Sequence, residues 1–316
     1  MGSFSILIAD EIHPSGIALL QSHGCFVEKQ YSISVERLIH SISSYDGLIV
    51  RGRTKVTREM IENGKKLKVI ARAGAGVDTI DIDAARAQGI PVINAHGANA
   101  EAVAEHTMAF TLMLARNMVP VSSALSRGSW EKKTYTAMEL EGKTLGIIGF
   151  GHIGSRVAQI ARTLGMVIIV YSSDIDEKRK QVQELSGKRM SLEALLRLSD
   201  VVSVHVPLTP ETRHLMGEKE FSCMKKTAYF INTARGEIVD EQALVKALQD
   251  GTIAGAALDV YEHEPLPVGS PLFALSNVIL TPHVASVSRE GAERVSRMIA
   301  EDIIRVLQRR PALGAV

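Results

Sequence analysis

The sequence predicts an α/β protein with parallel sheets, divided into two domains. Short apolar runs alternate with helical patterns from one end of the 316 residues to the other. These runs are continuous rather than alternating apolar and polar, as in strands that are buried on both faces of a parallel sheet. A long helical stretch separates the runs into two sets, and a chain of this length can bury two cores.

Ten apolar runs are the predicted strands, four before the long helix and six after it. In chain order they occupy residues 5–10, 47–51, 67–74, 91–95, 144–151, 167–172, 201–207, 228–234, 255–260 and 277–283. We expect the helix between the two sets to run from about Ala100 to Met118. It should end before Pro120, because proline disrupts the interior of a helix.

The last helical pattern, residues 288–310, is amphipathic and has no strand after it. Its apolar stripe must be buried, and a return to the first domain would bury it. We therefore expect one domain from residues 1–99 and 287–316, and a second from residues 100–286.

Composition excludes several classes of protein. Hydrophobic residues make up 46% of the chain and the formal net charge is +1, so we expect neither disorder nor the charge excess that binds nucleic acid or membranes. The longest apolar helical stretch is interrupted by Glu105 and His106. It therefore does not reach the roughly 18 consecutive apolar residues that a membrane span requires. Two cysteines and no secretory signal favour the cytoplasm and offer no cysteine metal site, so no metal is expected.

A glycine-rich turn follows the strand at residues 144–151. Gly149, Gly151 and Gly154 have the GxGxxG spacing, and a helix and a second strand follow within about 30 residues, as in a dinucleotide-binding unit. The first glycine permits the tight turn, the second admits a pyrophosphate, and the third lets helix pack on strand. The alternative is an ordinary turn between strand and helix that binds nothing.

The acid that should bind the ribose is displaced. Ser172 stands about where a carboxylate is expected, Ser173 follows, and Asp174 comes two residues later. Asp174 could instead cap the next helix together with Glu177. Arginine that would recognise a 2′-phosphate is missing from the strand end. The pattern favours NAD, with NADP as the alternative.

Three reactive side chains each follow a predicted strand. Arg235, Glu264 and His283 should therefore meet at the sheet edge that also carries the glycine turn, although each alone could be a solvated or structural residue. A histidine titrates near neutrality and can exchange a proton with an alcohol oxygen, while a carboxylate fixes its tautomer. An arginine can bind a substrate carboxylate. Together the three residues fit hydride transfer.

Four ordered motifs, "GFGHIG", "NTARGEIVD", "GAALDVYEHEP" and "LTPHVAS", resemble those of the D-isomer-specific 2-hydroxyacid dehydrogenases, and the resemblance extends from about Ile6 to Leu307. It implies two Rossmann-like domains with a cleft between them, a homodimer, a small 2-hydroxy or 2-keto acid substrate, and Arg235, Glu264 and His283 as the catalytic residues. It also implies that Asp259 holds the nicotinamide amide. The full set of cofactor contacts is then Gly149, Gly151, His152, Ile153, Gly154, Ser172, Ser173, Asp174, His205, Val206, Pro207, Thr233, Ala234, Asp259 and Ala285.

Within that family, "LIVRGRTKVT" and "RAGAGVDTID" resemble the branch that oxidises 3-phospho-D-glycerate. This resemblance implies that Arg51 and Arg53, with Lys55, form an anion patch, although a solvated turn is the alternative. Backbone N–H groups of Gly74, Ala75, Gly76 and Val77 would form a nest for a carboxylate. Asn99, at the hinge, would contact substrate.

Two features depart from that branch. "PHVASVS" is closer to the glyoxylate and hydroxypyruvate reductases, and Gly52 replaces a serine that many phosphoglycerate enzymes carry. A 2-keto acid reductase is therefore the alternative function. A nucleotide-sensing, corepressor-like binding protein is the alternative of another class, since some members that resemble this fold act in that way.

Overall fold

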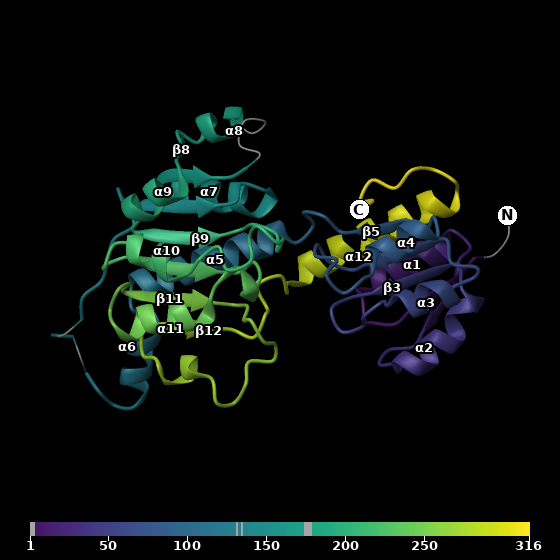
Figure 1. Ribbon diagram of the computed structural model, residues 1–316, viewed down its shortest axis with the longest axis horizontal. Coiled ribbons are helices and arrows are strands. Elements are labelled where there is room, and N and C mark those ends of the chain that lie inside the picture. The colour runs from purple at the N-terminus through teal and green to yellow at the C-terminus, as the bar shows by residue number, and fades with distance from the viewer. Residues whose placement is uncertain (1–3, 131, 134, 174–178) are drawn as a thin grey trace. The chain divides into compact units, whose positions relative to one another are not determined.

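The computed structural model describes residues 4–130, 132–133, 135–173 and 179–316. The chain divides into two compact units, Met1–Asn99 with Val287–Val316 (unit 1) and Ala100–Ser286 (unit 2). Each unit contains a sheet whose strands all pair in parallel (Figure 1). The α/β class predicted from the continuous apolar runs is confirmed.

Unit 1 is built on a sheet with the strand order β2-β1-β3-β4-β5. Its strands are β1 (Ser5–Ile8), β2 (Phe26–Lys29), β3 (Gly47–Val50), β4 (Val69–Arg72) and β5 (Val92–Asn94). Its α-helices are α1 (Pro14–Ser22), α2 (Val35–Ser41), α3 (Arg58–Asn63), α4 (Ile82–Ala87) and α12 (Arg289–Leu307), and its 3₁₀ helix is η1 (Ile42–Ser44).

Both faces of this sheet are buried along β1, β3, β4 and β5, which explains why these strands are largely apolar. Ile6 and Ile8 belong to the core beneath α1 and α12, whereas Leu7 between them belongs to the core beneath α2, α3 and α4. The helices α1 and α12 pack closely: a side chain at Gly16 would collide with Ser296, whose hydroxyl donates to the carbonyl of His13 at 2.7 Å. The apolar stripe of the last helix is thus buried in unit 1.

Unit 2 is built on a sheet with the strand order β12-β11-β10-β9-β6-β7-β8. Its strands are β6 (Thr144–Ile148), β7 (Val167–Tyr171), β8 (Lys188–Arg189), β9 (Val201–Val204), β10 (Tyr229–Asn232), β11 (Gly255–Leu258) and β12 (Val278–Leu280). Its α-helices are α5 (Ala100–Ala115), α6 (Met118–Ser126), α7 (His152–Thr163), α8 (Arg179–Glu184), α9 (Leu192–Leu198), α10 (Glu218–Cys223) and α11 (Glu241–Gln249), and its 3₁₀ helices are η2 (Gly236–Ile238) and η3 (Pro271–Ala274).

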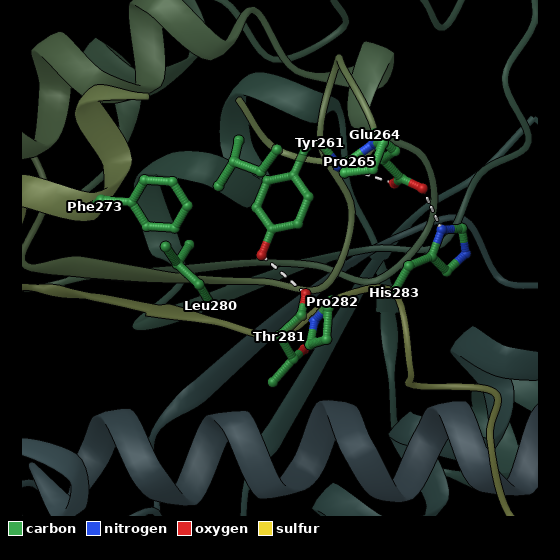
Figure 2. Close-up of a pocket in the computed structure, with 9 residues that line it drawn as sticks. Tyr261, Glu264, Pro265, Phe273, Leu280, Thr281, Pro282 and His283 are labelled. Carbon is green, nitrogen blue, oxygen red and sulfur yellow. Dashed lines mark hydrogen bonds and ion pairs between the residues drawn. The ribbon is translucent and has the colours of Figure 1, made fainter. Parts of the chain in front are cut away.

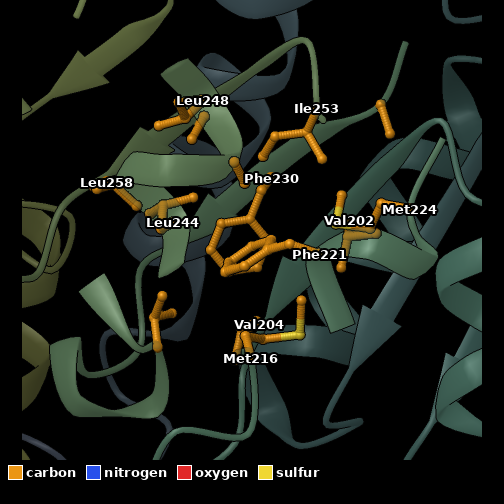
Figure 3. Close-up of a cluster of buried hydrophobic side chains, with 14 of the residues drawn as sticks. Val202, Val204, Met216, Phe221, Met224, Phe230, Leu244, Leu248, Ile253 and Leu258 are labelled. Atoms are coloured by element: carbon orange, nitrogen blue, oxygen red, sulfur yellow. The ribbon is translucent and has the colours of Figure 1, made fainter. Parts of the chain in front are cut away.

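The cores of unit 2 lie on opposite faces of its sheet. One core includes residues of α9, α10 and α11, and Phe221 and Phe230 meet there edge to face with ring centroids 5.3 Å apart (Figure 3). The other includes residues of α5 and α7, with Phe110 and Phe150 fully buried. Parallel strands between two helical layers bring all strand carboxyl ends to one edge, where the predicted site residues lie.

The sequence missed two strands and misplaced one helix end. β2 and β8 are edge strands, exposed or half-exposed and charged, so they lack the apolar run that marks the others. The helix expected from Ala100 to Met118 ends at Ala115, and a second helix begins at Met118 after Asn117 takes a left-handed φ of 47°. Pro120 lies in the first turn of that second helix. Proline is tolerated there because an N–H group at this position would have no acceptor within the helix.

Among the described residues, no single helix is long and apolar enough to cross a membrane. The pair α5 and α6 meets the length and composition criteria when taken together, but the two helices are bent by 66° at Arg116 and Asn117.

Candidate active site

The glycine turn has the geometry of a phosphate-binding loop. Gly149 takes a φ of 97°, and a Cβ there would lie 2.6 Å from the carbonyl oxygen of His205. A Cβ at Gly154 would collide with the carbonyl of Gly149, so this glycine permits the close packing of α7 on the turn. Gly151, the N-cap of α7, has nothing within 4 Å of the position of a Cβ. A side chain is therefore excluded at Gly149 and Gly154, whereas Gly151 has empty space beside it.

A dinucleotide fits this arrangement. The first helical hydrogen bond of α7 runs from the N–H of Ser155 to the carbonyl of Gly151. The amides of a helix's first turn lack intrahelical acceptors, and the helix dipole adds partial positive charge there. The open space at Gly151 lies beside these donors, which include those of His152 and Ile153. A pyrophosphate would be held by backbone N–H groups rather than by a charged side chain.

Of the three residues predicted to lie at the ribose, Ser172 has a hydrogen bond that the structure defines. Ser172, directly after β7, is buried, and its Oγ accepts a hydrogen bond from the N–H of Phe150 in the glycine turn at 3.4 Å. Ser173 beside it is exposed. Asp174, together with Glu177, lies outside the described residues. The carboxyl end of β7 thus presents hydroxyl groups at the place where the sequence pattern expects an acid.

His205 follows β9 and closes the other side of the turn. Its N–H donates to the carbonyl of Ile148 at 2.7 Å, and its Nε2 lies 2.9 Å from Ser203 Oγ. Its Nδ1 is out of solvent and has no hydrogen-bond partner among the described residues. Burial lowers the pKa of His205 to about 3, so the ring is neutral. Val206 and Pro207 continue the same segment.

Arg235 is presented by a tight turn after β10. Asn232 holds this turn from both ends, since its Oδ1 accepts from the N–H of Ala234 at 3.0 Å and its Nδ2 donates to the carbonyl of Arg235 at 2.9 Å. Thr233 is buried and shares a hydrogen bond with Thr107 of α5 at 3.1 Å. The Arg235 guanidinium donates to the carbonyl of Ala234 at 2.6 Å.

Glu264 and His283 meet as expected. His283 Nδ1 lies 2.6 Å from Glu264 Oε2, and the other carboxylate oxygen accepts the N–H of Tyr261 at 3.2 Å (Figure 2). Burial raises the pKa of Glu264, but the hydrogen bond from His283 and the charges of His283 and Arg235 outweigh it and hold that pKa below its ordinary value. Because an ionised carboxylate accepts, Nδ1 carries the hydrogen, and Nε2 is left to exchange protons.

Asp259 holds the segment on which His283 lies. Its carboxylate is almost completely buried and accepts the Thr281 hydroxyl at 2.5 Å and the N–H groups of Val284 and Ala285 at 2.8 Å each. His283 itself takes a left-handed φ of 54°. His106 of α5 lies 3.2 Å from Thr281 Oγ1 and supports the same turn. The role implied for Asp259, holding the nicotinamide amide, stays a prediction.

A cavity of about 640 Å³ lies beside the Glu264–His283 pair. Its walls are largely apolar, with Tyr261, Leu280 and Phe273 on the side away from His283 (Figure 2). The Tyr261 hydroxyl donates to the carbonyl of Thr281 at 2.9 Å, which fixes the wall of the cavity to the His283 segment.

In unit 1 the predicted anion patch is organised by Asp10. Its buried carboxylate accepts the N–H of Arg51 at 2.7 Å, and it also accepts Arg53 Nε at 3.1 Å. Thr54 adds its hydroxyl and its N–H. Burial raises the pKa of Asp10, but these hydrogen bonds bring that pKa below the ordinary value. Arg53 is thus partly engaged by its own chain, whereas the Arg51 side chain is exposed.

The second predicted substrate loop, Gly74–Val77, lies next to the same patch. Gly74 donates its N–H to the carbonyl of Arg72, whereas the next three amides make no hydrogen bond within the described part of the chain. Arg72 connects the loops, because its guanidinium would touch a Cβ at Gly52 at 4.0 Å and would collide with one at Gly74. Asn99 has a buried Oδ1 with no partner among the described residues.

Several residues that shape the site were not predicted from the sequence, namely Asp10, Arg72, His106, Asn232 and Thr281. Asp10, Arg72, Asn232 and Thr281 share one signal: each is a polar residue at or just after the carboxyl end of an apolar strand. His106 gave the same kind of signal as a titratable residue within an otherwise apolar helix.

Comparison with known proteins gives concordant matches. Residues 108–285 match the family model described as D-isomer specific 2-hydroxyacid dehydrogenase, NAD binding domain. D-3-phosphoglycerate dehydrogenase of Methanocaldococcus jannaschii is 44% identical over 305 residues, which cover 96% of this chain and 57% of that protein. Glyoxylate reductase of Aeropyrum pernix is 40% identical over 319 residues, covering 96% and 92%. The crystal structure of the TT0316 protein from Thermus thermophilus has a TM-score of 0.89 at 35% identity, covering 99% of both chains.

Proposed function

The chain belongs to the D-isomer-specific 2-hydroxyacid dehydrogenase family, and on that premise we propose that it transfers a hydride between a nicotinamide cofactor and a D-2-hydroxy acid. The observation that carries the proposal is the 2.6 Å contact of His283 with Glu264, at the sheet edge that holds the open glycine turn. The chain spans just over half the length of the phosphoglycerate dehydrogenases that it matches, so activity, substrate and partners are all part of the proposal.

The chain's own residues would supply proton transfer and orientation. In the reductive direction, His283 donates the proton on Nε2 to the substrate carbonyl oxygen, and in the oxidative direction Nε2 accepts it. Glu264 keeps Nδ1 protonated and stabilises the imidazolium. Arg235 binds the substrate carboxylate through its forked guanidinium. The bound nicotinamide supplies or accepts the hydride.

NAD is the cofactor we propose, with NADP as the alternative. The buried Ser172 and the exposed Ser173 offer neutral hydroxyl groups to the ribose, and neither carries the positive charge that recognises a 2′-phosphate. The proposed contacts from backbone at Val206, Thr233 and Ala234 agree with the positions of these residues after β9 and β10.

The substrate we propose is 3-phospho-D-glycerate. Three arginines belong to or contact the two predicted substrate loops of unit 1 and suit an anion larger than one carboxylate: Arg51, Arg53 and Arg72. A relative of nearly the same length is a glyoxylate reductase, and this favours the reduction of glyoxylate or hydroxypyruvate as the alternative.

A matrix of steady-state rates tests both choices. Purified protein should be assayed with 3-phospho-D-glycerate, glyoxylate, hydroxypyruvate and D-lactate, each with NAD(H) and with NADP(H). We expect the highest kcat/KM for 3-phospho-D-glycerate with NAD. Rapid reduction of glyoxylate with no turnover of the phosphate ester would overturn the substrate, and cofactor binding without any turnover would favour the sensor function.

A homodimer is also part of the proposal. Four apolar side chains of α6 are between 40% and 56% exposed, a patch of the kind that marks protein contacts: Met118, Val119, Val121 and Leu125. Leu125→Glu should shift the protein to a monomer in sedimentation, and an unchanged dimer would place the interface elsewhere.

The cytoplasm stays the predicted compartment. Cys25 and Cys223 are both free thiols and form no disulfide.

A further inference from the structure

A second cavity, of about 790 Å³, lies in unit 1 and is lined by residues of α1, α12, the segment after β5 and the C-terminal segment. It shares no lining residue with the predicted substrate loops at Arg51–Arg53 and Gly74–Val77. The proposed function gives this cavity no role.

Arginine dominates the charge of the cavity. Arg294, Arg297, Arg305 and Arg310 line it, against the carboxylates of Glu301 and Asp302. Asp302 is almost completely buried, and its two oxygens accept the N–H groups of Leu313 at 2.8 Å and Gly314 at 2.7 Å. Asp302 also lies 3.8 Å from Arg305 Nε, so this acid both holds the C-terminal segment and pairs with one of the arginines. Four arginines against two carboxylates leave the cavity with an excess of positive charge.

The arginines divide into an anchored pair and an unanchored pair. Arg294 donates through Nε to the carbonyl of Ala98 at 3.0 Å, and Arg305 donates through Nε to the carbonyl of Pro311 at 2.9 Å. These bonds orient the two guanidinium groups and leave other N–H donors for a ligand. The guanidinium groups of Arg297 and Arg310 form no ion pair or hydrogen bond with any residue that the structure describes, whereas the backbone N–H of Arg310 donates to the carbonyl of Arg305 at 2.8 Å.

The cavity also has apolar walls. Leu19, Ile304 and Met298 contribute to them, and Leu313 at the rim is 81% exposed. A purely inorganic anion would leave this apolar surface in water. Forked guanidinium groups favour phosphate, whose oxygens can each accept a hydrogen bond, while the apolar walls favour a ring or chain attached to it.

We propose that unit 1 contains a second anion site, which binds a phosphate-bearing molecule with an aromatic or other apolar body between α1, α12 and the C-terminal segment. Arg294 and Arg305 provide oriented donors, Arg297 and Arg310 add charge, and the apolar walls cover the body of the ligand. None of the residues that line this site is proposed to contact substrate or cofactor.

Isothermal titration of the full chain with 1-naphthyl phosphate, in the presence of saturating NADH, tests the site, and 1-naphthol is the probe without phosphate. We expect 1-naphthyl phosphate to bind at least 10-fold more tightly than 1-naphthol. Arg297→Glu and Arg310→Glu should each weaken its binding by 5-fold or more. Arg309→Glu is the matched control, because Arg309 is adjacent in sequence and does not line the cavity; it should change the affinity less than 2-fold.

Three outcomes would overturn the proposal. The first is no binding by the wild type at millimolar probe, and the second is equal affinity in Arg297→Glu, Arg310→Glu and wild type, which would place the probe elsewhere. The third is an equal loss in Arg309→Glu, which would indicate general charge attraction. Thermal melting of each variant shows whether it is folded, and the comparison does not depend on the enzyme's substrate.

Discussion

The contact between His283 and Glu264 decides which ring nitrogen can exchange a proton. Nδ1 is held by the carboxylate at 2.6 Å, so in the proposed reaction the proton that enters or leaves the substrate passes through Nε2. The lowered pKa of Glu264 keeps that carboxylate ionised well below neutrality. In the proposed reaction, Glu264 therefore acts through His283, as a positioning residue.

Replacing Glu264 by Gln tests this role. The amide is neutral, so it cannot stabilise the imidazolium, and we expect kcat to fall about 10²-fold while the Kd of NADH stays within 2-fold. Stopped-flow rates and fluorescence titration measure the two quantities. Glu262→Gln, in the same loop, should keep the wild-type kcat. A loss of NADH binding in Glu264→Gln would assign this residue to the cofactor instead.

Ser172 should control the choice between the nicotinamide cofactors. An aspartate there keeps an oxygen that accepts from the N–H of Phe150 and adds negative charge, which repels a 2′-phosphate. We expect Ser172→Asp to raise the ratio of kcat/KM for NAD over NADP by about 10-fold. Ser173→Asp is the exposed control and should change the ratio less. A clear NADPH preference in the wild type would contradict the proposed cofactor.

At the residue scale, the sequence could indicate that Glu264 and His283 meet, because both follow strands of one parallel sheet. It could not indicate that Asp10 would bind the 51–54 turn, more than 40 residues away. A hydrogen bond between distant residues depends on the exact path of both segments. Only the position of a polar residue at a strand end is visible in the sequence.

At the scale of elements, the three glycines of the turn have different roles, two in the fold and one in the proposed binding of the cofactor. Gly149 and Gly154 are required by the fold itself, since a Cβ on either would meet backbone, whereas Gly151 has open space around it and an ordinary φ of −81°. Fold and ligand binding can therefore be separated by substitution within one turn.

Gly151→Ala should leave the free energy of unfolding within about 0.5 kcal/mol of wild type, because alanine fits the backbone and the space there. It should weaken NADH binding by 10-fold or more, since the methyl group occupies the space proposed for the pyrophosphate. Gly149→Ala should instead destabilise the protein by about 1–3 kcal/mol. Urea unfolding and NADH titration check both variants. Tight NADH binding by Gly151→Ala would mean that the cofactor avoids this turn.

The elements that the sequence missed have one physical cause. Buried parallel strands are recognisable by continuous apolar runs, but β2 and β8 lie at sheet edges and need no such run. Pro120 indicated a helix end at the wrong place, because proline is tolerated in the first turn of a new helix as well as after an old one. Only the left-handed Asn117 separates the two cases, and its conformation depends on the fold.

At the scale of the whole molecule, the fold class and the family followed from the order of strands and motifs. Substrate choice did not, because the substrate residues proposed in unit 1 and the catalytic residues proposed in unit 2 belong to separate compact units. The sequence shows what each unit carries, whereas discrimination between similar acids depends on details of fit. Relatives named for two different substrates match this chain at about 40% identity.

The stability of the whole chain should depend on pH through His205. The pKa of its buried ring is about 3, against an ordinary value of 6.5, so below pH 6.5 the unfolded chain binds a proton that the folded chain does not. Stability is then fully present above pH 6.5 and is lost as the pH falls toward 3, at up to about 1.4 kcal/mol per pH unit. The carboxylates whose pKa values are lowered stabilise the fold above their ordinary pKa and lose that contribution only at lower pH: Asp10, Glu28, Asp46, Glu211 and Glu264.

Urea unfolding between pH 6.5 and pH 5 isolates this effect. The wild type should lose about 2 kcal/mol over that interval. His205→Gln should lose distinctly less, whatever its stability at pH 7, because glutamine does not titrate. His263→Gln, at an exposed loop position, is the matched control and should keep the wild-type slope. Equal slopes in wild type and His205→Gln would show that the ring takes up its proton without unfolding, which would require water or a new partner at Nδ1.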